Sequence, residues 1–336
     1  MGVRRICADP EAGDPVDIGN MSRDIKDTEA LEREDEYVHD CLVGNQERSS
    51  FRLDVAEDAT VIAVPINSVG YNCLSLLGGL TKDQLRWMFS NYDDTQLQAT
   101  GWDPSSLNNS DGNPGTHKWS ELDARCEAKE IRLIGGKRGD GPFAAMESFI
   151  LNDSENGETI AGDNDRPQGY TGADDYDIMV SLMRNPSAVG FLGHKFYAEK
   201  QNLFWGAPIM NDAGEFVVPS TETISDETYP IRRYLFMNVL NDEDSLKYTA
   251  PLLDFGFSHP ELVTASGYVP LRGKTMQDML ARLHRAPYIV DLLEDDENEG
   301  FEFSSIVFLG PVVIALLLIV CVTAVIYIRL KGSSKR

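Results

Sequence analysis

A glycine-rich segment with three charged residues is the first part of the sequence whose residue types could do chemistry. It runs Gly135-Gly-Lys-Arg-Gly-Asp-Gly141. Its glycines are typical of a phosphate-binding loop, but the Gly-Lys-Ser/Thr ending of a nucleotide-binding loop is absent. The tripeptide Arg138-Gly-Asp140 also occurs in integrin ligands, yet such a short motif arises often by chance. The segment alone therefore predicts neither nucleotide binding nor adhesion.

Motifs of catalysis and of metal binding are missing. The chain has no Gly-x-Ser-x-Gly elbow and no His-Glu-x-x-His pair. No CxxC or Cys/His ligand spacing indicates zinc, and the acids Asp174, Asp175 and Asp177 lack the spacing of an EF-hand, so a solvated face is the preferred interpretation. We expect no enzyme activity, no catalytic residue, no metal and no cofactor. The five histidines are scattered and none accompanies a nucleophile: His39, His117, His194, His259 and His284.

The elements that would position any site alternate between strands and helices. Thr81 with Gln84 three residues later predicts a capped helix start. Alternation of this kind predicts an α/β domain. Apolar runs predict strands over Ala59–Pro65, Ile131–Ile134 and Leu235–Val239, and amphipathic patterns predict helices over Thr81–Ser90, Pro142–Leu151, Tyr176–Arg184 and Met276–Leu283.

The C-terminal segment Ile306–Leu330 is apolar and uncharged up to Arg329. It is long enough to cross a bilayer core of ~30 Å as one helix. Basic residues follow it, and an acidic run, Glu294-Asp-Asp-Glu-Asn-Glu299, precedes it. Because basic residues stay on the cytoplasmic side, we expect a single-pass protein, in the plasma membrane, with a short cytoplasmic tail and an extracellular or luminal ectodomain.

Composition fits a globular ectodomain. Hydrophobic residues make up 42% of the chain and charged residues 25%, and roughly 300 residues suffice for two lobes of about 150. The net charge of −24 argues against nucleic acid as a partner. No apolar export signal follows Met1. A membrane span with no export signal leads us to expect an N-terminally incomplete sequence, with later insertion of the helix as the alternative.

Four cysteines lie outside the predicted membrane helix. They can form two disulfides in three pairings, and the sequence does not choose among them. Four buried thiols are the alternative. The residues are Cys7, Cys41, Cys73 and Cys126.

Five segments, in order, resemble the PstS-type phosphate-binding proteins of ABC import systems. The longest runs from Val218 to Val239 and resembles the family's P-S-x-E-T-I-x-x-G-T-Y-P-L-x-R-P-L-Y. Each motif alone is weak, but five in the right order are specific, and they cover residues 2 to about 275. The other four are Asp17-Ile-Gly-Asn-Met-Ser-Arg23, Leu80-Thr-Lys-Asp-Gln-Leu85, Ala188-Val-Gly-Phe-Leu-Gly-His-Lys-Phe-Tyr197 and Gly267-Tyr-Val-Pro-Leu271.

The resemblance implies a two-lobed periplasmic-binding-protein-like fold of type II, with an anion between the lobes. Residues 1–65 and 232–285 would form lobe I, and residues 66–231 lobe II. An acidic linker (286–304), a membrane helix (305–330) and a tail (331–336) would follow. The family begins with a strand, a donor loop and a helix that have no counterpart here, so we expect lobe I to lack them and to expose part of its core.

The resemblance also names the candidate site. The family's Ser-Gly-Thr helix start aligns with Asp140-Gly-Pro142, where a carboxylate replaces a hydroxyl and proline removes an N–H. Arg132, Lys137 and Arg138 flank this segment and could compensate, although solvated surface charges are the simpler interpretation. The family-like turn Asp17–Arg23 contributes the hydroxyl of Ser22. The alternative role of this hydroxyl is to cap the following helix. The expected phosphate- or oxyanion-binding residues are Ser22, Arg23, Gly139, Asp140, Gly141 and Phe143.

Two functions are favoured, and a hydrolase that uses acidic residues is the third, minor alternative. The first is a membrane-tethered solute-binding protein that captures inorganic phosphate or a related oxyanion for uptake or sensing, with the lipid bilayer and a phosphate transporter as partners. The second is a PstS-like ectodomain that has lost anion binding and serves as a surface recognition or structural protein. Asp140 and Pro142 favour the second.

Overall fold

The computed structural model of the protein describes residues 2–23, 25–33, 37–90, 117–137, 139–151 and 170–285. The chain divides into two compact units, Met1–Ala286 and Pro287–Arg336, and every described residue belongs to the first. Across these ranges no helix is both long and apolar enough to cross a bilayer. The predicted linker, the membrane span Ile306–Leu330 and the tail lie outside the described residues.

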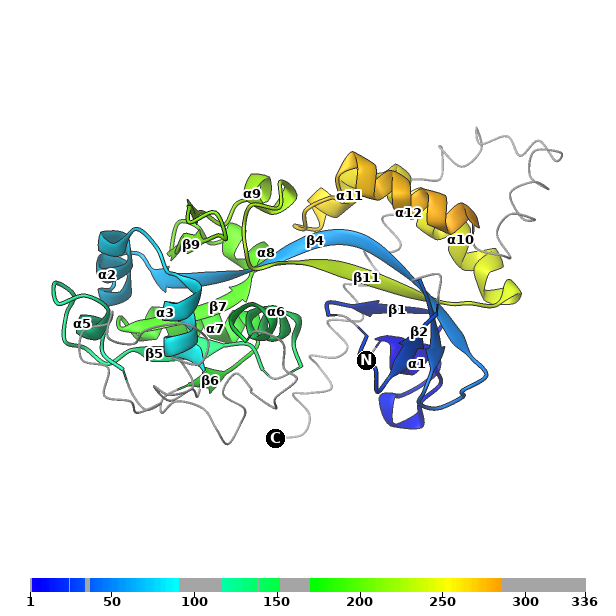
Figure 1. Ribbon diagram of the computed structural model, residues 1–336, viewed down its shortest axis with the longest axis horizontal. Coiled ribbons are helices and arrows are strands. Elements are labelled where there is room, and N and C mark those ends of the chain that lie inside the picture. The colour runs from blue at the N-terminus through cyan, green and yellow to red at the C-terminus, as the bar shows by residue number, and fades with distance from the viewer. Residues whose placement is uncertain are drawn as a thin grey trace, which may run out of the picture. The chain divides into compact units, whose positions relative to one another are not determined.

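Two long antiparallel strands, β4 (Ser49–Pro65) and β11 (Arg232–Leu240), run through the centre of the structure (Figure 1). β4 pairs with β3 and β11 along its first part, and with β7 and β8 along its last residues. We call the elements around the first part lobe I and those around the second part lobe II. The boundaries at residues 65/66 and 231/232 stay predictions.

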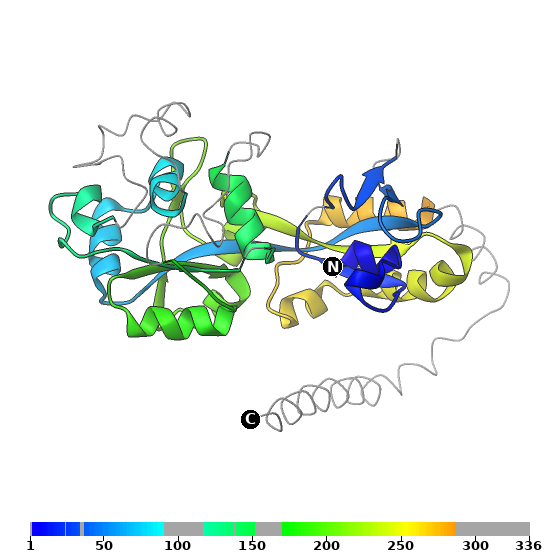
Figure 2. The same ribbon diagram turned by 90° about the horizontal axis from the view of Figure 1, so that it is seen from below.

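Lobe I is a small sheet with helices on both faces. Its sheet order is β1-β11-β4, with β3 and β2 continuing from β4. Figures 1 and 2 show α1 on one side of β4 and β11, and α10 to α12 on the other. The lobe contains α1 (Gly2–Ile6), a 3-10 turn (Pro10–Ala12), β1 (Ile18–Met21), β2 (Ala30–Glu32), β3 (Val38–Cys41), α10 (Glu243–Ser258), α11 (Pro260–Ala265) and α12 (Gly273–Arg285).

Lobe II has the sheet order β4-β7-β5-β6, in which β5 is parallel to β6 and β7. Ile62 and Val64 of β4 face one apolar cluster while Val61 and Ala63 face another, so the strand is buried on both sides. That is why residues 61–64 of β4 are continuously apolar. The elements are α2 (Val69–Leu77), α3 (Lys82–Phe89), α5 (Trp119–Leu122), β5 (Arg132–Gly135), α6 (Gly141–Ile150), β6 (Thr171–Gly172), α7 (Asp175–Arg184), β7 (Ala188–Gly193), α8 (His194–Ala198), β8 (Phe204–Gly206), β9 (Ile209–Met210), β10 (Phe216–Val217) and α9 (Thr221–Ser225).

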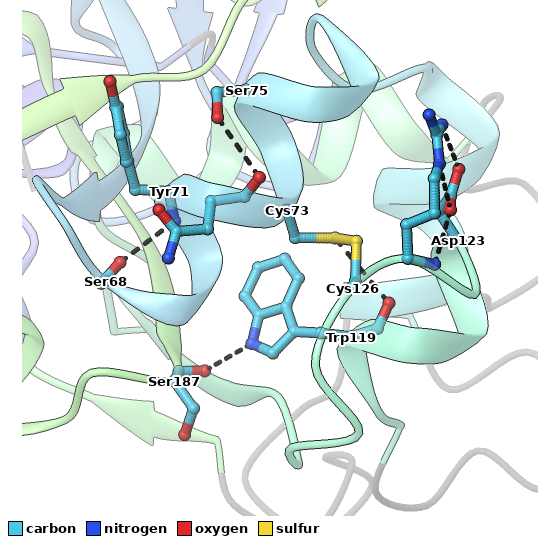
Figure 3. Close-up of a disulfide and its surroundings, with 10 residues drawn as sticks. Ser68, Tyr71, Cys73, Ser75, Trp119, Asp123, Cys126 and Ser187 are labelled. Carbon is cyan, nitrogen blue, oxygen red and sulfur yellow. Dashed lines mark hydrogen bonds and ion pairs between the residues drawn. A yellow bond between two sulfur atoms is a disulfide. The ribbon is translucent and has the colours of Figure 1, made fainter.

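Each lobe holds one disulfide. Cys7 pairs with Cys41 in lobe I, and Cys73 on α2 pairs with Cys126 after α5 in lobe II. Figure 3 shows the second bond beside the fully buried Trp119, whose Nε1 donates a hydrogen bond to the Ser187 carbonyl at 3.0 Å. The structure therefore contains one of the three pairings that the sequence left open.

The predicted elements are found, with one large difference in length. α3 begins with the predicted capping box, since Thr81 and Gln84 exchange both hydrogen bonds. β4 begins at Ser49 rather than Ala59. Its added part contains Arg52, Asp54 and Glu57, and these charges break the apolar pattern by which a strand is recognised.

Candidate functional site

The candidate site begins with the backbone N–H groups at the N-terminus of α6, which no side chain of the N-cap residue engages. Asp140 is the N-cap residue, but its side chain makes no cap hydrogen bond to the helix. It accepts instead from the Lys137 amide at 3.0 Å. Pro142 has no N–H, so Gly141 and Phe143 supply the donors of the first turn. Such donors, with the helix dipole behind them, favour an anion.

Two side chains from lobe I approach this helix start. An added Cβ on Gly141 would overlap both Ser22 Oγ and Arg233 Nη1. Ser22 follows β1, and Arg233 lies on β11. Thr60 of β4 holds the same turn, because its hydroxyl donates to the Pro142 carbonyl at 3.2 Å. The structure thus brings a hydroxyl, a guanidinium and a helix N-terminus together.

Arg233 forms a buried ion pair with Asp58 of β4. Arg233 Nη2 lies 2.6 Å from Asp58 Oδ2, and the two side chains are 12% and 5% exposed. Within the described residues, Nε and Nη1 of Arg233 and Oδ1 of Asp58 are buried without a hydrogen-bond partner. Unpaired buried polar atoms cost free energy, so these three atoms make the pair a candidate ligand contact.

Three further titratable side chains surround the pair. Burial raises the pKa of Asp175, which accepts a hydrogen bond from the Gly193 amide at 3.3 Å. Burial lowers the pKa of His194, with the charge of Asp58 opposing, and raises the pKa of Tyr268, with Asp58 adding. The imidazole is therefore neutral at pH 7, and its Nδ1 has no partner in the described part of the chain. Arg233 is the cation of this group.

Comparison with known proteins finds phosphate-binding proteins of similar sequence. The phosphate-binding protein PstS of Staphylococcus aureus is 23% identical over 244 residues, and that of Staphylococcus saprophyticus is 22% identical over 240 residues. These matches cover 73% and 71% of the chain. The chain is thus distantly similar in sequence to these PstS phosphate-binding proteins. It spans only 58% and 59% of the length of these two relatives, and no family model matches it.

A solved structure shows the fold. A possible phosphate binding protein from Planctomyces limnophilus superposes with a TM-score of 0.52 at 18% identity, over 85% of this chain and 84% of that one. The chain therefore shares the mixed α/β, periplasmic-binding-protein-like fold of that structure.

Five of the six predicted site residues lie at or next to the start of α6, and the sixth, Arg23, is engaged elsewhere. Ser22 and Gly141 meet at the helix start, and Asp140 occupies its N-cap position without a cap hydrogen bond. Phe143 reaches the site only through its backbone, since its side chain is 1% exposed in the core of lobe II. Gly139 has a φ of 93°, with open space around it.

Arg23 is engaged elsewhere in lobe I. Its two terminal nitrogens donate to both oxygens of Glu29, each at 2.9 Å. Burial acts to raise the pKa of Glu29, but the hydrogen bonds from Arg23 and from the Lys26 amide hold it below its ordinary value. This bidentate pair fixes the turn after Ser22 and gives Arg23 a structural role.

Two of the cations that could compensate for Asp140, Lys137 and Arg132, are exposed surface charges, which is the interpretation that the sequence favoured. Lys137 forms an exposed ion pair with Asp174 at 2.9 Å, and Arg132 is exposed beside Glu130. Arg138 lies outside the described residues. The positive charge comes from Arg233 instead, which lies 95 or more residues away in sequence from each of these three.

Sequence reasoning missed Arg233, Asp58 and Asp175. Arg233 stands inside the family-like segment Val218–Val239, so the arginine of that pattern was an available signal. Asp175 was assigned to a solvated acidic face, but it is half-buried. The structure gives no metal centre, because no group of three His, Cys, Asp or Glu side chains among the described residues could hold an ion.

Proposed function

We propose that this protein captures phosphate or a related oxyanion between its lobes. Ser22 Oγ, the amides of Gly141 and Phe143, and Arg233 would donate hydrogen bonds to the anion. The protein would be a solute-binding protein, not an enzyme. Neutral donors at a helix N-terminus with one countercharge are a common way to hold an oxyanion.

One observation carries this proposal. Arg233 keeps two nitrogens buried and without partner among the described residues, directly beside Ser22 and the uncapped start of α6. A planar guanidinium offers its free N–H groups to two oxygens of one tetrahedral anion. A purely structural Arg233 would direct these groups to carbonyls or to a second carboxylate.

The carboxylates constrain which oxyanion fits. Asp58 has a buried oxygen with no partner in the described part of the chain, and Asp175 has a raised pKa. A ligand that brings its own proton can donate it to one of these carboxylates, whereas a fully ionised anion would be repelled. Hydrogen phosphate carries such a proton at pH 7 and sulfate does not. We therefore expect phosphate to bind and sulfate to bind far more weakly.

Titration calorimetry of the purified protein with sodium phosphate tests the proposal. We expect Arg233→Gln to weaken phosphate binding at least tenfold, since charge-assisted hydrogen bonds contribute about 1.5–3 kcal/mol each. Arg232→Gln is the matched control. Arg232 is the preceding residue on β11 and pairs with Glu227 at 3.1 Å. Equal losses in the two variants, or no phosphate binding by the parent protein, would contradict the proposal.

The second function, an ectodomain without anion binding, has its own supporting observation. Pro142 removes one donor from the first turn, and Asp140 places a carboxylate at the same helix start. The double variant Asp140→Ser with Pro142→Thr separates the two functions. A gain in phosphate affinity of about a hundredfold or more over a parent that barely binds would favour the second function, whereas a parent that already binds tightly favours the first.

The remaining parts of the proposal concern location. We infer that Ile306–Leu330 anchors the protein in a membrane with residues 1 to about 300 outside, for delivery of phosphate to a transporter or for sensing. We expect the full chain to stay in the membrane pellet after alkaline carbonate extraction. We also expect protease added to intact cells to cleave the ectodomain. Release into the supernatant would remove the tether from the proposal.

A further inference from the structure

The segment between α11 and α12 runs beside β4 at the candidate site. Glu57 and Val269 exchange two backbone hydrogen bonds, of 2.7 Å from the Glu57 amide and 3.0 Å from the Val269 amide. This bridge is antiparallel, so the next pair in the same register is Asp58 opposite Tyr268. Residues directly opposite each other share a face, and on its other side Asp58 is opposite Arg233. Tyr268, Asp58 and Arg233 therefore form one row across three backbone segments.

The start of α8 lies over this row and contacts its tyrosine. A Cβ on Gly193 would come within 3.6 Å of Asp58 Oδ2. Lys195 Nζ lies 5.1 Å from the centre of the Tyr268 ring, which is the geometry of a cation–π contact. The stem of Lys195 packs on Gly267, since a Cβ there would lie 3.0 Å from Lys195 Cγ. A lysine of lobe II thus fixes the ring of a tyrosine of lobe I.

The hydroxyl of Tyr268 is the polar group that this contact leaves unused. The side chain is half-buried, and the hydroxyl makes no hydrogen bond within the part of the chain that the structure describes. Burial raises the pKa of Tyr268, and the charges of Asp58, Arg233 and Asp175 also act on it. The phenol therefore stays protonated at neutral pH, close to the charged groups of the candidate site, and keeps its O–H for donation.

We propose that Tyr268 is a further anion-binding residue, whose hydroxyl donates a hydrogen bond to the captured oxyanion. Ser22 follows β1, which lies beyond β11, whereas Tyr268 lies beyond β4. The two hydroxyls therefore flank the Arg233–Asp58 pair from opposite sides, and both add donors without adding charge. Lys195 is a positioning residue, because it acts on the anion through the ring. Since it adds a donor to the same site, this role of Tyr268 rests on the proposed function.

Titration calorimetry with sodium phosphate tests the hydroxyl. Tyr268→Phe keeps the ring and its contact with Lys195 but removes the donor. We expect it to weaken phosphate binding by about fivefold or more, the effect of one neutral hydrogen bond. Tyr248→Phe is the matched control, because Tyr248 lies on α10 and is 76% exposed. It should bind phosphate as the parent does.

Lys195 needs a test that separates positioning from a remote charge. Lys195→Met keeps most of the stem and removes the cation, while Lys195→Arg keeps a cation over the ring. We expect Lys195→Met to weaken binding about threefold or more and Lys195→Arg to restore it. Both are measured at about 0.1 M and about 1 M sodium chloride, since salt screens a remote charge but leaves a ring contact in place. The loss in Lys195→Met should persist at the higher salt concentration.

Fluorine NMR of protein labelled with 3-fluorotyrosine gives a second readout. The resonance that is missing from Tyr268→Phe belongs to Tyr268. We expect this resonance to shift when phosphate is added to the parent, and to shift less in Lys195→Met.

The outcomes separate this role from the proposed function. If Arg233→Gln loses phosphate and Tyr268→Phe binds it like the parent, or if the Tyr268 resonance does not respond to phosphate, the role of Tyr268 is overturned and the proposed function stands. A loss in Lys195→Met that disappears at about 1 M salt would overturn the positioning role of Lys195. A parent protein that binds no phosphate would overturn both proposals together.

Discussion

Arg233 and Asp58 stand directly opposite each other on the two crossing strands. They are partners in the β4–β11 register, and Arg233 Nη2 lies 2.6 Å from Asp58 Oδ2. The pair is buried, and it leaves one carboxylate oxygen and two guanidinium nitrogens without a hydrogen bond among the described residues. One pair of side chains thus joins the strands that connect the lobes and also presents the free groups of the candidate anion site.

The buried pair leads to a prediction about stability. Asp58→Asn should destabilise the protein by roughly 3 kcal/mol, because the charge of Arg233 would remain buried without its partner. Thermal denaturation in phosphate-free buffer measures the loss. Asp123→Asn, which breaks a solvent-exposed pair with Arg125, is the control and should leave the melting temperature unchanged. Similar melting temperatures for the parent and Asp58→Asn would contradict the assignment of a buried charge pair.

The close contact at the helix start leads to a second prediction. Gly141→Ala should abolish phosphate binding while the protein still folds, since the added methyl group would displace Ser22 and Arg233 from α6. Gly256→Ala on α10 is the control, because nothing lies within 4 Å of the position that its added Cβ would take. Calorimetry with phosphate and a far-ultraviolet circular dichroism spectrum of each variant make the comparison. Full binding by Gly141→Ala would place the anion elsewhere.

Local sequence patterns pointed to those parts of the candidate site that are formed by neighbouring residues. The glycine at the start of α6 and the turn that carries Ser22 were both recognised from short motifs. Arg233 and Asp58 could not be paired in this way, because 175 residues separate them. Their contact depends on the register between β4 and β11, which only the folded sheet defines.

Successive side chains of a strand point to opposite faces, which is why the sequence did not single out Arg233 from its neighbour Arg232. Arg232 and Arg233 are adjacent and chemically identical, yet they point to opposite faces of β11. Arg232 lies near Glu57 and Glu227, whereas Arg233 lies near Asp58 and the start of α6. Residue type and periodicity alone do not tell which of two adjacent arginines faces the candidate site. A bulge between Leu235 and Phe236 also shifts the register of β11 against β4.

The disulfide of lobe II leads to a third prediction. Cys73→Ser with Cys126→Ser should lower the free energy of unfolding by about 4 kcal/mol in the chain-entropy model, since the bond closes a loop with a sequence separation of 53. Because Trp119 packs beside this bond, its fluorescence should report the transition (Figure 3). Urea denaturation of the parent and of the variant, both without a reducing agent so that the Cys7–Cys41 bond stays intact, measures the difference. A variant as stable as the oxidised parent would show that the bond does not constrain the chain.

Glu57 leads to the last prediction, a fall in stability as the pH rises towards neutrality. Its side chain is 1% exposed, Oε2 has no hydrogen-bond partner in the described part of the chain, and the nearby guanidinium of Arg232 is 3.7 Å away. Burial raises the pKa of Glu57 from 4.5 to about 7, while Arg232 opposes the shift and Glu227 adds to it.

The folded protein therefore holds one more proton than the unfolded chain between pH 4.5 and about 7. Its free energy of unfolding should fall across this window, by at most roughly 3 kcal/mol. Glu57→Gln keeps the shape of the side chain and removes the titration, so its stability should exceed that of the parent at pH 8 and match it near pH 4.5. Urea denaturation of both proteins at intervals from pH 4.5 to 8 measures the difference. Parallel curves for the two proteins would mean that Glu57 is ionised in the folded state throughout this range.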